Sequence, residues 1–124
     1  MVCSSAHAQI ATPGLTQTFT APGNSKVIST INLNGNNYNV NHTVQAFSTG
    51  SPTTCTAHLW GTLKRASDNP VFPTDYADLS GSIDCTTVTM FHVVGKPVVN
   101  VVIQLATFSG GTTPTVTFRY IGNY

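Results

Sequence analysis

The chain has 124 residues, which fits a single domain. Only 7% of them are Asp, Glu, Lys or Arg, against about 25% in an average soluble domain, and the net charge is +1. This balance argues against a nucleic-acid partner and against a polybasic membrane patch, and no stretch approaches the roughly 20 apolar residues of a spanning helix. Such a surface is either solvated by Thr and Asn or covered by partners.

The composition favours strands over helices. The chain has no Glu and few Leu, and Thr, Val, Ser, Asn and Gly dominate it. Thr and Val are stiff at χ1 and fit a pleated surface, while Asn, Gly and Ser supply turns. We therefore predict an all-β protein.

Residues 1–14 are predicted to form a flexible N-terminal arm, and residues 15–124 the folded domain. The arm has no hydrophobic face and ends in Pro13-Gly14. Within it, Ala6-His7-Ala8 is typical of a secretory cleavage site, but no basic region or long apolar core precedes it. The segment is either the remnant of a signal peptide that begins upstream or an arm that a neighbouring chain orders.

Strands are predicted first at 15–20, 26–33 and 37–47. Asn34-Gly35 separates the second from the third and predicts a hairpin, because both residues tolerate positive φ. A fourth strand at 53–63 is predicted to place Cys55, Ala57, Leu59 and Leu63 on its inner face and Trp60 on the opposite face. The long loop at 64–82 follows and holds three of the four Asp residues.

The last three strands are predicted at 85–93, 98–106 and 115–120. In the middle one, Val99, Val101, Ile103 and Leu105 form one apolar face, and Val98, Val102 and Ala106 make the other face apolar as well. A strand that is apolar on both sides is usually covered on its outer surface. We therefore predict an interface that contains Trp60 and these three outer residues, Val98, Val102 and Ala106.

About seven strands separated by turn signals predict one antiparallel β-sandwich, jelly-roll or immunoglobulin-like. Two of the three cysteines, Cys55 and Cys85, fall on inward phases of strands. They either bridge the sandwich or remain two buried free thiols.

Candidate chemical groups are few. The histidines are His7, His42, His58 and His92, and no spacing among them makes metal ligands converge. The carboxylates in and beside the long loop, Asp68, Asp75, Asp78 and Asp84, favour turns over Ca²⁺ binding or glycoside hydrolysis. No nucleophile elbow or phosphate-binding loop is present. We predict no catalytic residue, no metal and no cofactor.

The run DLSGSIDCTTVTMFHVVGKPVVNVVIQLATFSGGTTPTVTFRYIGN at 78–123, with SPTTCTAHLWGTL at 51–63, resembles small structural proteins of tailed bacteriophages and prophages. The resemblance covers roughly residues 40–123 and lies in the paired valine-rich strands, the Ser-Gly-Gly turn and the final T-V-T-F strand. It implies a β-sandwich on a virion, as a capsid decoration, tail component or adhesive module. Residues 65–70 replace the turn that such chains often carry, which argues against carrying over any ligand-binding role attached to that turn.

The function expected from these observations is that of a non-enzymatic structural protein of the virion. Its expected partners are other virion proteins and further copies of itself, without nucleic acid or membrane. The alternative is a secreted, extracellular β-sandwich that binds carbohydrate or acts as an adhesive module. In that alternative the partner is a glycan, and aromatic side chains such as Trp60 would bind it.

Overall fold

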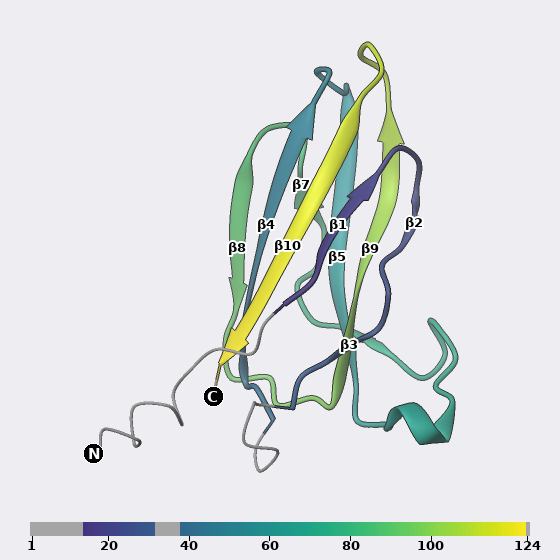
Figure 1. The fold of residues 1–124 in the computed structure, drawn as a ribbon, viewed down its shortest axis with the longest axis vertical. Coiled ribbons are helices and arrows are strands. Elements are labelled where there is room, and N and C mark those ends of the chain that lie inside the picture. Colours follow the sequence, from purple (N-terminus) through teal and green to yellow (C-terminus); the bar gives the residue numbers. More distant parts are fainter. Residues whose placement is uncertain (1–13, 32–37, 124) are drawn as a thin grey trace, which may run out of the picture.

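The computed structural model describes residues 14–31 and 38–123, which form two antiparallel β-sheets packed face to face (Figure 1). The predicted all-β sandwich is confirmed. The one helical element among these residues is a 3-10 turn at Ala66–Asp68. Residues 1–13 of the predicted arm and the predicted turn at Asn34-Gly35 lie outside the described residues.

The first sheet, called sheet A, has the strand order β1-β10-β4-β8. Its strands are β1 (Thr16–Phe19), β4 (Asn41–Thr49), β8 (Thr89–Val93) and β10 (Thr115–Asn123). The pair β10 and β4 is continuous, from Thr115 opposite Thr49 to Asn123 opposite Asn41.

The second sheet, called sheet B, is built on β5 (Thr54–Thr62) and β9 (Asn100–Ser109). Two short strands pair with β9, namely β2 (Gly23–Asn24) and β3 (Ile28–Ser29). Two others pair with β5, namely β6 (Ala77–Asp78) and β7 (Ile83–Asp84). Ala57 pairs with Leu105 and Thr56 with Thr107, so Ala106 is the extra residue of a β-bulge.

Two predicted strands differ from those in the structure. Of the strand expected at 26–33, the described residues form only β3 and an isolated bridge between Ile31 and Tyr38, while β2 lies before it, at a predicted turn. The strand expected at 85–93 begins only at Thr89, because β7 pairs in sheet B and β8 pairs in sheet A. Residues 85–88 therefore carry the chain from one sheet to the other.

The core lies between the sheets and follows the predicted alternation. Its least exposed apolar side chains, at 1% or less, come from both layers: Val44, Ala46, Ala57, Leu59, Cys85, Val101, Ile103, Leu105, Val116 and Phe118. Phe19 packs edge-on against Phe118, with 5.7 Å between ring centroids. The prediction that Leu63 points inward is wrong, because β5 ends at Thr62 and the Leu63 side chain is 74% exposed.

Two turns pack together at the end of the sandwich drawn uppermost in Figure 1. The Thr112 amide donates to the Gly50 carbonyl at 2.8 Å. Gly111 has a φ of +71°, and a Cβ on it would lie 2.1 Å from the Gly50 oxygen. Glycine is required at Gly111 because of both its backbone conformation and this close approach.

Candidate interaction surfaces

The predicted interface residues do not form an exposed patch. Val98 belongs to the main core, 8% exposed, and its methyl groups lie against Gly61. Val102 lies on the outer face of sheet B but is only 3% exposed. The prediction that these two side chains present an apolar surface is therefore wrong, while Ala106 is partly exposed at the bulge.

Val102 is buried by other side chains of the same chain. Trp60 pairs with Val102 across β5 and β9, and the long loop brings Phe72 edge-on to the indole, with centroids 5.1 Å apart. Tyr76 follows at 5.5 Å from Phe72 and is 9% exposed. Burial raises the pKa of the Tyr76 hydroxyl. These three residues are called the aromatic cluster: Trp60, Phe72 and Tyr76. The cluster starts at Trp60, the cross-strand partner of Val102, and extends from it into the long loop.

Polar groups surround the aromatic cluster. The Trp60 indole N–H donates to Gln104 Oε1 at 2.9 Å, and the His58 ring lies 6.2 Å from the indole. His58 Nδ1 lies 2.8 Å from Asp78 Oδ2, and both side chains are partly exposed. An aromatic ring beside fixed donors and acceptors is an arrangement that can bind a polar ligand with an apolar face, such as a sugar.

The outer face of sheet A is a different surface. Met90 on β8 is 52% exposed and Ile121 on β10 is 48% exposed. Both line a surface hollow of about 290 Å³, and its full lining is Gly14, Leu15, Thr16, Thr43, Gln45, Met90, Arg119, Tyr120 and Ile121. The four strands of sheet A contain Arg119 and no Asp or Glu, and the guanidinium lies 5.8 Å over the Phe47 ring. This face is therefore mainly polar, rich in Thr, with Phe47, Met90 and Ile121 as its large apolar side chains and Arg119 as its one Lys, Arg, Asp or Glu.

This face was not predicted from the sequence. Ile121 lies beyond the predicted end of the last strand, at 120. The outward phase of the other strands does contain a signal, because Met90 and Phe47 are large apolar residues at positions where a solvated face would be polar.

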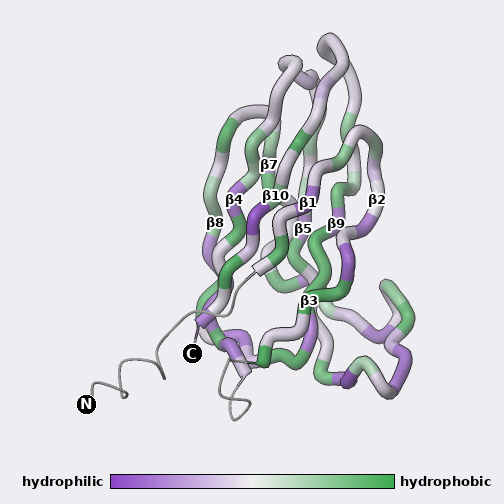
Figure 2. Tube along the Cα trace, viewed as in Figure 1, coloured by the Kyte–Doolittle hydropathy of each residue, from purple (hydrophilic) through white to green (hydrophobic). Residues whose placement is uncertain are grey.

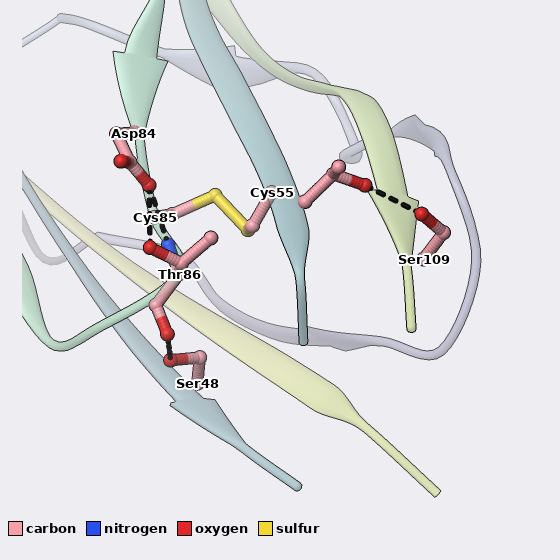
Figure 3. The surroundings of a disulfide bond; sticks show 7 residues. Ser48, Cys55, Asp84, Cys85, Thr86 and Ser109 are labelled. Atoms are coloured by element: carbon pink, nitrogen blue, oxygen red, sulfur yellow. Dashed lines mark hydrogen bonds between the residues drawn. A yellow bond between two sulfur atoms is a disulfide. The ribbon is translucent and has the colours of Figure 1, made fainter. Parts of the chain in front are cut away.

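The two cysteines on inward phases are joined. Cys55 on β5 and Cys85 after β7 form a disulfide with an S–S distance of 1.99 Å and a Cα–Cα distance of 4.9 Å. Figure 3 shows the bond between β5 and the segment that leaves sheet B, where the Thr86 carbonyl accepts from Ser48 Oγ on β4 at 2.9 Å. Of the two interpretations left open by the sequence, the structure contains the bridge.

Of the three histidines that the structure describes, His42 on β4 is the buried one, 1% exposed. Its Nε2 lies 2.9 Å from the Lys96 carbonyl, and its Nδ1 lies 2.7 Å from the Tyr120 hydroxyl. A carbonyl only accepts, so Nε2 carries the proton and Nδ1 accepts from Tyr120. Burial lowers the pKa of His42 and raises that of Tyr120.

The four carboxylates close separate local turns. Asp68 accepts from the Arg65 amide, and Asp78 accepts from the Gly81 amide as well as facing His58. Two hydrogen bonds hold the pKa of Asp75 below its usual value: the larger effect comes from the Val71 amide and the smaller from Lys64 Nζ. The amide and hydroxyl of Thr86 lower the pKa of Asp84. Across residues 14–31 and 38–123, no three His, Cys, Asp or Glu side chains gather as metal ligands would.

Within the same described ranges, no helix is long and apolar enough to cross a membrane.

Comparisons with known proteins show a likeness in fold. No protein-family model matches the chain, and no curated protein matches its sequence. The crystal structure of the SPBc2 prophage-derived protein YomS is similar, with a TM-score of 0.51 and 14% identity over 91% of this chain and 96% of that one. The structure of IMPa from Pseudomonas aeruginosa, in complex with an O-glycopeptide, has a TM-score of 0.40 and 12% identity over 94% of this chain but only 13% of its own. The sandwich described above is thus similar in fold to a whole prophage-derived protein.

Proposed function

We propose that this chain is a non-enzymatic structural protein of a phage or prophage particle, a capsid decoration or tail accessory that binds other particle proteins. The likeness to a prophage-derived protein supports the setting, because it extends over 96% of that chain. The local use of the carboxylates supports the absence of catalysis, since each one closes its own turn or faces His58.

The outer face of sheet A is the observation that carries this proposal. A strand whose outer face meets water normally carries polar residues at its outward positions. Met90 and Ile121 occupy outward positions, but both are large, apolar and about half exposed. They border a hollow that an apolar side chain of a partner can enter. Arg119 is the only charge on the strands of this sheet, so the fitting partner is an apolar ridge flanked by a carboxylate.

The test is co-sedimentation with particles assembled in a host that lacks this protein. Ile121→Lys places a charge beside Arg119 in the contact and should abolish co-sedimentation. Leu63→Lys is the matched control, because Leu63 is 74% exposed and lies outside sheet A, and it should bind as wild type does. A wild-type protein that stays in the supernatant contradicts the proposal, and so does equal binding by the Ile121→Lys variant.

The second candidate function is a secreted carbohydrate-binding or adhesive module, and the aromatic cluster favours it. Trp60 has His58 and Gln104 beside it, which gives a ring face and hydrogen-bonding groups within one sugar's reach. Trp60 is the only tryptophan of the chain, so its fluorescence reports binding directly. A saturable change in Trp60 fluorescence on titration with glycans would favour this function over the first, provided that the Gln104→Ala variant does not show it.

A further inference from the structure

The edge strands of the two sheets differ in how well they are protected against pairing with another chain. In sheet B, the strands beyond β5 and β9 have two residues each, and β6 and β7 end in Asp78 and Asp84. In sheet A, β1 has four residues, of which three are polar. Short length and charge are the usual means of blocking an open edge.

The remaining edge, β8, has neither form of protection. It spans five residues, Thr-Met-Phe-His-Val, and pairs with β4 in an unbroken register from His42 opposite Val93 to Ala46 opposite Thr89. No described strand pairs with its other side. From Thr86 to Val94 the chain contains no Asp, Glu, Lys, Arg, Pro or Gly. In an antiparallel pair, the backbone groups that do not point to β4 point outward along this edge.

Exposed apolar side chains gather at the same strand. Val88 is 58% exposed, Met90 52% and Val94 72%, and they are three of the eight large hydrophobic residues exposed in the described part of the chain. Figure 2 shows hydrophobic segments along β8, which forms the left border of the molecule in that view. The other five are spread over loops and other strands, so the clustering at β8 is specific to this edge.

We propose that two copies of the chain pair antiparallel along β8, with Phe91 at the two-fold axis, and join their A sheets into one sheet of eight strands. In this register Met90 lies across from His92, Thr89 from Val93, and Val88 from Val94 of the second copy. An antiparallel two-fold contact requires a strand that is complementary to its own reverse.

The β8 strand meets that requirement on both faces. Phe91 pairs with the buried Val44, so Thr89, Phe91 and Val93 form the inner row, and the proposed register keeps them together. Met90 and His92 form the outer row of β8, and Val88 and Val94, which flank the strand and are exposed, extend this row in the proposed register to a largely apolar strip across the two copies. No like charges oppose one another, and each cross-strand pair adds stability.

The test is the mass of the intact, oxidised protein by sedimentation velocity over a range of micromolar concentrations. Val88→Asp and Val94→Lys should each weaken the dimer by about tenfold or more, because each places two unpaired charges in the contact. The double variant Val88→Asp/Val94→Lys should regain most of the affinity, since the carboxylate introduced at position 88 of one copy then faces the ammonium introduced at position 94 of the other, at both ends of the contact. Val27→Asp, at a residue 53% exposed away from this edge, should dimerise as wild type does.

A wild-type protein that is monomeric throughout this range overturns the proposal. So does a dimer that Val88→Asp and Val94→Lys leave intact, or one that the double variant does not restore while circular dichroism shows a native fold. The Ile121→Lys variant distinguishes this pairing from particle binding, because Ile121 lies on β10, two strands from the edge, although Met90 belongs to both surfaces. The Ile121→Lys variant should therefore remain a dimer whether or not the protein binds particles.

Discussion

Acidification below about pH 6.5 should destabilise this fold through the buried ring of His42. Burial lowers the pKa of His42 in the folded state from its ordinary value of 6.5. Below that value the unfolded chain takes up a proton that the folded chain does not, so the free energy of unfolding falls as the pH falls. The contribution of His42 to the free energy of unfolding is fully present above pH 6.5 and is lost as the pH falls below that value.

The magnitude follows from this linkage. While the folded ring stays neutral, each pH unit below 6.5 removes up to about 1.4 kcal/mol of unfolding free energy. Protonation would also cost the hydrogen bond in which Nδ1 accepts from the Tyr120 hydroxyl, and the ring is 1% exposed, so water cannot replace that partner.

The assay is urea unfolding followed by the fluorescence of Trp60, at pH values on both sides of 6.5. His42→Gln should be less stable than wild type at neutral pH and should lose the acid slope between about pH 7 and 5.5. His92→Gln, at an exposed histidine, should keep the slope. A wild-type free energy of unfolding that stays constant across this range, or a slope that survives in His42→Gln, would refute the role of His42.

Three further predictions concern stability. Reduction of the Cys55–Cys85 bond should lower the free energy of unfolding by about 3–4 kcal/mol, since the bond closes a loop with a sequence separation of 30, and an unchanged urea midpoint with reductant would contradict this. Val102→Lys should unfold the domain or cost about 3 kcal/mol or more, because it buries an unpaired charge, and a native thermal midpoint would show that the position is accessible. Gly111→Ala should cost about 1–3 kcal/mol more than Gly81→Ala, since both have positive φ but only Gly111 meets a backbone oxygen; equal costs by urea unfolding would mean that the close approach is absent.

The sequence was sufficient to predict the sandwich because alternation with a period of two is a local property. Cys55, Ala57 and Leu59 are buried and Trp60 points to the opposite face, as their phases predicted. The aromatic cluster beside Val102 could not be predicted in this way, because Trp60, the cross-strand partner of Val102, packs against Phe72 from an irregular loop. The apolar outer positions of β9 correctly indicated a covered face, but the covering residues belong to this chain and not to a partner.

The switch between the sheets is the second feature that the sequence did not reveal. Residues 85–93 were predicted as one strand, yet Asp84 just before them pairs with Thr56 in sheet B and Thr89 pairs with Ala46 in sheet A. Local pattern carries no record of which sheet a strand joins. The exposed face of sheet A depends on the same long-range pairing, because Met90 and Ile121 meet around one hollow only after β8 and β10 flank β4.

The pairing of β1 with β10 determines how the fold would respond to a pulling force. Thr16 lies opposite Arg119 and Phe19 opposite Val116, so both described ends of the chain leave the sheet at one pole. Tension applied to those two ends loads the hydrogen bonds between β1 and β10 one after another, as in a zipper, and a zipper opens at low force. The Cys55–Cys85 bond would still prevent the segment between the two cysteines from extending. That segment has a sequence separation of 30 and an extended length of roughly 100 Å.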